Sequence, residues 1–266
     1  MPGRPKDIVG LKAMSIAAQR WYEYFRPSGV KVHAGAPVIE HGMVEEDFAE
    51  MSKAGVKYLG EVGLGTVKDG KTANEMVSWA RKYGMQSTIH TGGPSIPGSG
   101  LIDADMVIET GTDVIGHING GHSALPDDQI ICLCETCKSA FEIVHNGNER
   151  AAVLTVNTAR ELGKLDQVIL GTDGPAGSGV QPLGILRMIA MLSAFGSVPA
   201  AEAFCFGTGN TSRQRELTVG LIEKGYSADF VLLDQAQHAP GTSMLHSVEL
   251  GNLPGVGMTI IDGLIR

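Results

Sequence analysis

Six short apolar runs recur along the chain, and each ends in polar residues. They are "VKVHAG" (30–35), "LGEVGL" (59–64), "QSTIHT" (86–91), "DVIGHIN" (113–119), "FEIVHNG" (141–147) and "QVILGTD" (167–173). Most of them are rich in Val, Ile or Leu and bounded by glycine, which is typical of short buried β-strands. We therefore predict six strands over these ranges.

The segments between these runs have helical periodicity. The clearest example is "TANEMVSWARKYG" (72–84), in which Thr72 and Glu75 fit a capping box and Gly84 can supply a left-handed residue at the helix end. Strands that alternate with helices predict parallel strands covered by helices. The fold class expected from the sequence is therefore α/β.

Polar residues at the strand ends recur with a regular spacing of 28, 29, 27, 28 and 28 positions. They are His33, Glu61, His90, His117, His145 and Asp173. A (β/α)₈ TIM-type barrel has units of about this length and builds its active site from the carboxyl ends of its strands. The spacing predicts that these side chains surround one pocket.

Composition favours a small-molecule substrate. The 266 residues carry a formal net charge of -8 and contain no run of five basic residues, so we expect neither nucleic acid nor a membrane as a partner. The chain has no signal-peptide pattern, and its four cysteines, three of them in "CLCETC" (132–137), do not form a disulfide framework. We expect a cytoplasmic protein with reduced thiols.

Imidazole and carboxylate side chains are suitable ligands for divalent zinc, iron, manganese or cobalt. Glu61, His90 and His117 could supply the three protein ligands of a catalytic site. A metal ion there would lower the pKa of bound water and polarise an amide carbonyl. Asp173 could take the proton of that water and pass it to the leaving nitrogen.

The strand-end series Glu, His, His, Asp resembles the amidohydrolase superfamily of metal-dependent barrel hydrolases. The strings "GVKVHAGAPVIEHGMVEEDF", "GEVGLGT", "HTGGPSIPGSG", "HINGG" and "GTDGPAGSGVQPLGILR" are similar to members that open a cyclic enamide in nicotinate degradation. The resemblance implies a small-molecule cyclic amide as substrate, zinc or iron as cofactor, and a homo-oligomer, by analogy a tetramer.

The resemblance also implies roles for four residues. Glu61 would bridge two metal ions, His90 and His117 would hold the second ion, and Asp173 would ligate the first ion and act as the catalytic base. The candidate pocket or outer-shell residues are His33, His145 and Asn119.

The resemblance divides the chain into three parts. Residues 1–29 would be the remnant of the segment after barrel strand 2, residues 30–215 an incomplete barrel with strands 3–8, and residues 216–266 the C-terminal strands of a small β-sandwich. The superfamily's H-x-H pair of strand 1 does not occur in the sequence. We therefore expect an N-terminally truncated member that holds one metal ion or none instead of a stable binuclear pair.

Two other functions remain open from the sequence. The glycine-rich "GTDGPAGSGVQPLGILRM" (171–188) would suit a phosphate-binding barrel lyase or isomerase. A truncated paralogue could instead serve as a non-catalytic subunit.

Overall fold

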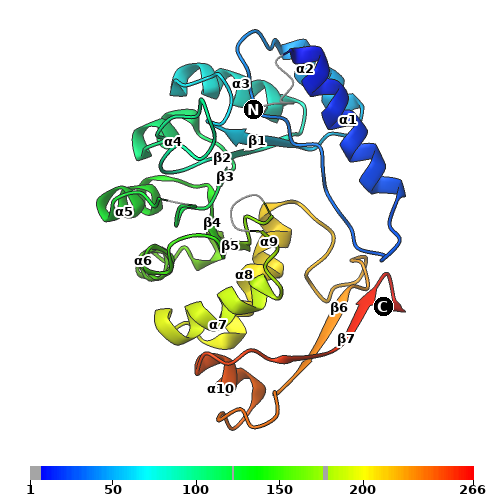
Figure 1. Cartoon of the computed structure of the whole chain (residues 1–266), viewed down its shortest axis with the longest axis vertical. Coiled ribbons are helices and arrows are strands. Elements are labelled where there is room, and N and C mark those ends of the chain that lie inside the picture. The colour runs from blue at the N-terminus through cyan, green and yellow to red at the C-terminus, as the bar shows by residue number, and fades with distance from the viewer. Residues whose placement is uncertain (1–6, 122, 176–178) are drawn as a thin grey trace. The chain divides into compact units, whose positions relative to one another are not determined.

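The computed structural model describes residues 7–121, 123–175 and 179–266 (Figure 1). The predicted remnant at 1–29 and the glycine-rich segment that follows Asp173 therefore lie partly outside the described residues.

Helices and strands alternate through most of the chain, as the periodicity predicts (Figure 1). The helices are α1 (Ile8–Tyr24), α2 (Glu45–Lys53), α3 (Gly70–Lys82), α4 (Ala104–Thr110), α5 (Asp127–Thr136), α6 (Glu149–Glu161), η1 (Leu165–Gln167), α7 (Gly184–Gly196), α8 (Ala200–Gly207), α9 (Gly209–Gln214) and α10 (Met244–Glu249). The strands are β1 (Tyr58–Val62), β2 (Gln86–Ile89), β3 (Val114–Ile115), β4 (Ala140–Val144), β5 (Val168–Gly171), β6 (Phe230–Asp234), β7 (Gly255–Ile261) and β8 (Leu264–Ile265).

Five strands form one sheet in the order β1-β2-β3-β4-β5. The pairs β1–β2, β2–β3 and β4–β5 are parallel. These strands fall within the predicted runs or one residue outside them, so the prediction of an α/β fold with a parallel sheet is confirmed. Each strand is shorter than its run, because the last residues of every run lie beyond the end of the strand.

The predicted strand at 30–35 is wrong. The whole stretch 25–44 lies in no strand, and Val30 and Val32 are 50% and 42% exposed. A strand of a parallel sheet is buried on both faces. The apolar residues of this run therefore alternate as they would in a strand, but they are not covered as a strand would be.

The chain divides into two compact units. The first contains residues 1–116 and 135–139, and the second contains residues 117–134 and 140–266. In the first unit α3 packs against α2, α4, β1 and β2, and α1 packs against α2. Phe48, Met51 and Ile89 are fully buried there and belong to the core.

The start of α3 differs from the predicted capping box. Asp69 is the N-cap, and its side chain accepts a hydrogen bond from Thr72 N at 2.8 Å. The helix is therefore capped three residues before the predicted cap Thr72, because the short carboxylate of Asp69 reaches the N–H groups of the first helical turn. The predicted end of the helix is confirmed, since Gly84 has a φ of 73°.

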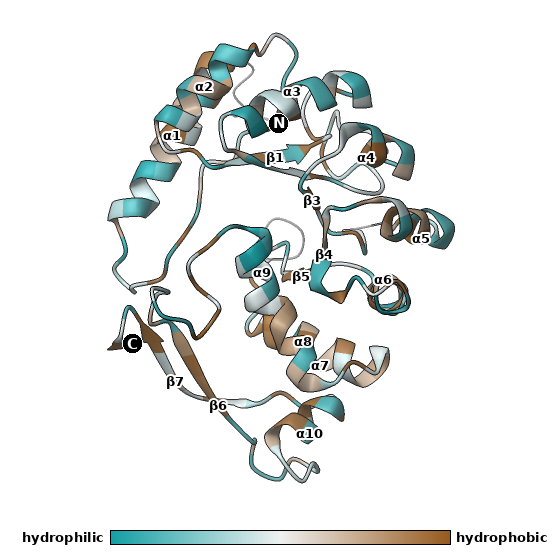
Figure 2. Cartoon of the chain, turned by 180° about the vertical axis from the view of Figure 1, so that it is seen from behind, coloured by the Kyte–Doolittle hydropathy of each residue, from teal (hydrophilic) through white to brown (hydrophobic). Residues whose placement is uncertain are grey.

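In the second unit, β4 and β5 are paired from Phe141 opposite Val168 to Val144 opposite Gly171. Helix α6 packs against β4, and α7, α8 and α9 pack against β5. The strands β6, β7 and β8 form a separate antiparallel sheet with apolar exposed residues, coloured brown along β6 and β7 in Figure 2.

Among the helices of the described residues, none combines the length and the apolar character that crossing a membrane requires.

Candidate metal centre

Three of the predicted ligands lie at the carboxyl ends of neighbouring strands. Glu61 is the fourth residue of β1, His90 directly follows β2, and His117 is the second residue after β3. The neighbours in the sheet are hydrogen-bonded and parallel, so their carboxyl ends meet at one edge. The 28-residue period of the sequence is thus a repeat of the strand-helix unit.

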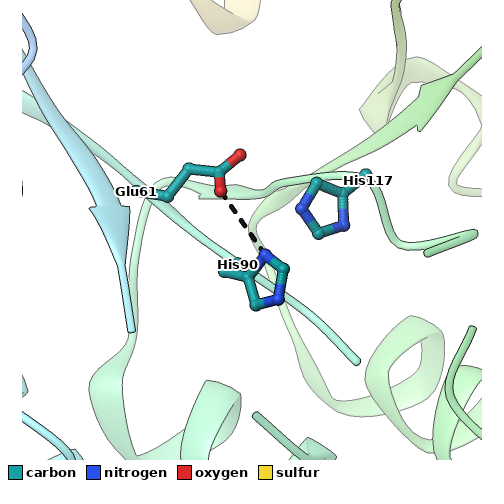
Figure 3. Close-up of side chains that lie close together, drawn as sticks. All are labelled: Glu61, His90 and His117. Carbon is teal, nitrogen blue, oxygen red and sulfur yellow. Dashed lines mark ion pairs between the residues drawn. The ribbon is translucent and has the colours of Figure 1, made fainter. Parts of the chain in front are cut away.

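These side chains converge, as Figure 3 shows. One ligand atom from each of Glu61, His90 and His117 lies within 4.8 Å of the other two. His90 Nδ1 is 3.4 Å from Glu61 Oε2. Both histidines are 3% exposed, whereas the Glu61 side chain is 29% exposed. We call Glu61, His90 and His117 the ligand cluster.

The hydrogen bond of His90 indicates which of its nitrogens faces the cluster as an acceptor. His90 Nε2 lies 2.9 Å from the carbonyl oxygen of Gly93. A carbonyl oxygen only accepts hydrogen bonds, so Nε2 carries the proton and neutral His90 presents the lone pair of Nδ1. This lone pair faces the carboxylate of Glu61, and a cation between the two acceptors would relieve their repulsion.

The ligand cluster fits a divalent metal ion. Zinc binds imidazole nitrogen and carboxylate oxygen at about 2.0–2.2 Å, so ligand atoms around one ion are roughly 3–4 Å apart. The separations in the cluster are compatible with this range after small side-chain adjustments.

Asp173 is held by a different partner. It lies two residues after β5 with a φ of 55°, and its Oδ2 accepts a hydrogen bond from Asn146 Nδ2 at 3.3 Å. The group of converging ligand atoms among the described residues does not include Asp173. Its role as ligand and base stays a prediction. Asn146 was missed from the sequence, where its one signal is its place beside His145 at the end of β4.

Asn119 is buried, and its side chain forms hydrogen bonds with the backbone of Val144 at the end of β4. It is 1% exposed; its Nδ2 donates to Val144 O at 3.0 Å, and its Oδ1 accepts from Val144 N at 2.9 Å. These bonds fix the residues at the end of β4. Asn119 therefore acts on His145 and Asn146 through the backbone that carries them.

The two remaining candidates lie outside the ligand cluster. His145 directly follows β4, and its backbone N–H donates to Gly171 O at 3.1 Å. His33 lines a pocket of the first unit together with Tyr58. The predicted common pocket of six strand-end residues is thus supported for Glu61, His90 and His117, and His33 does not belong to their cluster.

The cysteines of "CLCETC" form no disulfide in the described part of the chain. Cys134 is buried and Cys132 and Cys137 are half-buried. Within the described part of the chain, the ligand cluster is the one group of three or more converging metal-ligand side chains. The reduced state of the thiols stays a prediction.

Comparison with known families decides the assignment of the fold. The model of the amidohydrolase family matches residues 70–265. The chain belongs to the amidohydrolase family. The predicted membership is thereby confirmed, and it favours hydrolysis over the lyase or isomerase chemistry that the glycine-rich segment left open.

An amidohydrolase with close similarity to this chain is enamidase from Eubacterium barkeri. The two are 42% identical over 262 residues, which cover 98% of this chain and 68% of enamidase. The crystal structure of enamidase matches with a TM-score of 0.96 over 100% of this chain and 69% of that chain. The predicted resemblance to enamidase is confirmed.

More distant solved structures share the fold. A β-aspartyl dipeptidase from Fervidobacterium islandicum matches with a TM-score of 0.58 at 19% identity, over 86% of this chain and 60% of its own. A 5-methylcytosine deaminase from Klebsiella pneumoniae matches with a TM-score of 0.56 at 14% identity, over 97% of this chain and 67% of its own. At these identities the likeness concerns the fold alone.

Proposed function

We propose that the protein is a metal-dependent hydrolase that opens the C–N bond of a cyclic amide. The observation that carries this proposal is the convergence of Glu61, His90 and His117 at one edge of the sheet. The 42% identity to enamidase supports the choice of a cyclic enamide or lactam among amidohydrolase substrates.

The ligand cluster would hold a divalent metal ion, zinc or iron. When bound, such an ion lowers the pKa of a coordinated water towards 7 and polarises the amide carbonyl. The Gly93 carbonyl keeps the proton of His90 on Nε2, so Nδ1 remains available to the ion. His90 and His117 would hold what the resemblance calls the second ion, Glu61 would bridge it to the first ion where one is present, and Asp173 would ligate that first ion.

Asp173 would act as the base. Its carboxylate would accept a proton from the attacking water and donate it to the ring nitrogen as the C–N bond breaks. The amide of Asn146 donates to Oδ2 of Asp173, which restrains the rotation of the carboxylate and leaves Oδ1 for proton transfer. The chain's own residues thus supply ligation, proton transfer and orientation.

The finer predictions about the fold accompany this function. We infer that β1–β5 correspond to strands 4–8 of a (β/α)₈ barrel and that β6–β8 belong to a small β-sandwich. Residues 30–215 would then be the catalytic domain and residues 216–266 the sandwich strands. A cytoplasmic location, a tetrameric assembly and a place in nicotinate degradation stay predictions.

The experiment uses the whole chain loaded with zinc or with ferrous iron under argon. It is incubated with 6-oxo-tetrahydronicotinate, and ring opening is followed by the loss of enamide absorbance. An open-chain amide is the matched control substrate. We expect metal-dependent turnover of the cyclic substrate only; a protein that binds metal at the ligand cluster but opens no cyclic amide would refute the proposed function.

A further inference from the structure

A second concave site lies in the first unit, at the amino end of β1. The cavity has a volume of about 510 Å³, within the range typical of ligand pockets. Three segments form its walls: the last turns of α1 with Arg26, the stretch 31–34, and the connection from α2 into β1 at residues 53–58. All three belong to the same compact unit.

One wall is a polar helix face. Gln19, Tyr22 and Glu23 line the cavity at the spacing i, i+3, i+4, which places them on one side of α1, and Arg26 follows just beyond the end of the helix. Such a stripe is usually apolar and packs on a core. In the first half of α1, the same side of the helix carries the buried residues Leu11 and Ser15. This side is therefore packed in the first half of the helix and lines the cavity in the second half.

The walls carry a concentration of positive charge. Arg26, Lys31, Lys53 and Lys57 line the cavity, and the one carboxylate among its lining residues is Glu23. We call this cavity the basic pocket. The whole chain has a formal net charge of -8, so the cluster opposes the charge of the protein. A concave wall of one sign concentrates the field and attracts ions of the opposite sign.

Local structure brings these cations to one place. Arg26 donates through Nε to Val30 O at 3.3 Å and through Nη2 to Gly29 O, which anchors its guanidinium to the turn. Lys53 ends α2 and Lys57 directly precedes β1. Gly55 between them has a φ of 98°, a conformation that suits glycine and allows this sharp connection.

Aromatic side chains complete the lining. Tyr22 and Tyr58 line the basic pocket, and the rings of His33 and Tyr58 meet edge to face with centroids 6.3 Å apart. Partial burial lowers the pKa of His33, and the positive charges of Lys57 and Lys31 lower it further. The local field is therefore positive enough to oppose protonation of a neighbouring imidazole.

The basic pocket is separate from the ligand cluster. Tyr58 begins β1 and Glu61 is three residues further along, which is about 10 Å of extended strand. We infer that the basic pocket binds a small organic anion, a carboxylate or a phosphate carried on a planar body. The lysines and Arg26 would pair with the anionic group, and Tyr22 and Tyr58 would contact the planar body.

The test measures binding of phenyl phosphate and of isophthalate to the full chain by calorimetry, at constant ionic strength. These two probes distinguish a phosphate from a carboxylate ligand. Inorganic phosphate lacks the planar body, and benzamide lacks the charge. We expect saturable binding of at least one organic anion, weakened about tenfold or more by the double substitution Lys53→Gln and Lys57→Gln.

A matched double variant, Lys71→Gln and Lys138→Gln, removes the same charge from two exposed lysines elsewhere and should bind as the original chain does. His117→Ala should also bind normally, because the ligand cluster is a different site. The inference is wrong if neither organic anion binds, if benzamide or inorganic phosphate binds as tightly, or if the matched variant loses affinity equally. Loss of binding in His117→Ala would likewise overturn it, since the anion would then occupy the metal site.

Discussion

The two ends of β1 differ in chemistry although Glu61 is only three positions after Tyr58. The amino end borders the basic pocket, where four cationic side chains face one carboxylate. The carboxyl end contributes Glu61 to the ligand cluster, where acceptor atoms converge. One end is therefore suited to an anion and the other to a metal cation.

The histidines at the two ends show the same contrast. Partial burial lowers the pKa of His33, and the positive charges of Lys57 and Lys31 lower it further. His90 faces the carboxylate of Glu61 at 3.4 Å and is oriented by Gly93 O. The same residue type thus adopts opposite electrostatic roles because its neighbours differ, and the strand-end position alone does not specify the role.

The largest expected effect comes from substitutions in the ligand cluster, at the carboxyl end of β1. Glu61→Gln and His90→Ala each remove a ligand atom of the cluster, so we expect the loss of at least one metal ion per chain and of cyclic-amide turnover. Elemental analysis after dialysis measures the metal. The variant Lys53→Gln with Lys57→Gln should retain the full metal content, and an unchanged stoichiometry in Glu61→Gln would contradict the proposed ligation.

The second effect concerns proton transfer. In Asp173→Asn the side chain keeps its shape but loses its basicity, so we expect kcat to fall by about 10²–10⁴-fold. The metal ion of the ligand cluster should remain bound, because its three ligands are unchanged, and binding of organic anions to the basic pocket should not change. Steady-state kinetics with elemental analysis of the same sample makes the check; retained activity would exclude Asp173 as the base.

A smaller effect is expected from the residue that holds Asp173. Asn146→Ala removes a hydrogen bond to a charged acceptor, and such bonds contribute about 1.5–3 kcal/mol. We expect kcat to fall by roughly tenfold or more with an unchanged KM, because the substitution affects the orientation of the base and not the binding of substrate. An increase in KM at constant kcat would indicate that Asn146 contacts the substrate instead.

The smallest expected effect concerns the pH dependence of stability that His33 causes near the amino end of β1. Because the folded-state pKa of His33 lies below its ordinary value of 6.5, the unfolded chain binds more protons in the interval between the two values. The contribution of His33 to stability is therefore present above pH 6.5 and is lost as pH falls through the lowered pKa. In His33→Gln the free energy of unfolding should depend less on pH in the range below 6.5.

Urea denaturation at several pH values measures this difference, and NMR titration of the His33 ring measures the pKa itself. Lys57→Gln should raise that pKa towards its ordinary value. A His33 pKa above 6.5 in the unliganded protein would show that the field of the basic pocket is not positive.

The strands and the ligand cluster were accessible from the sequence because both follow one period. Glu61, His90 and His117 recur with the strand-helix unit, and parallel strands carry equivalent positions to the same edge. The run at 30–35 has the same local pattern but is not a strand, since Val30 and Val32 are exposed. Strand propensity does not reveal whether a neighbour covers both faces.

The basic pocket and Asn146 were not predicted because no period connects their parts. The cations of the basic pocket come from three separate segments: Arg26, Lys31, and Lys53 with Lys57. In the sequence alone, each of them is typical of an ordinary solvated charge. Asn119 has a clear reason for its place only in the structure, where its amide pairs with the backbone of Val144. Contacts between segments of different type depend on tertiary packing, which local sequence patterns do not encode.

The most direct test of the central claim is anomalous diffraction at the zinc edge from crystals of the zinc-loaded chain. We expect a peak about 2.0–2.2 Å from a nitrogen of each of His90 and His117 and from a carboxylate oxygen of Glu61, and no such peak in His90→Ala. A zinc ion bound elsewhere, with the ligand cluster empty, would contradict the proposed metal site.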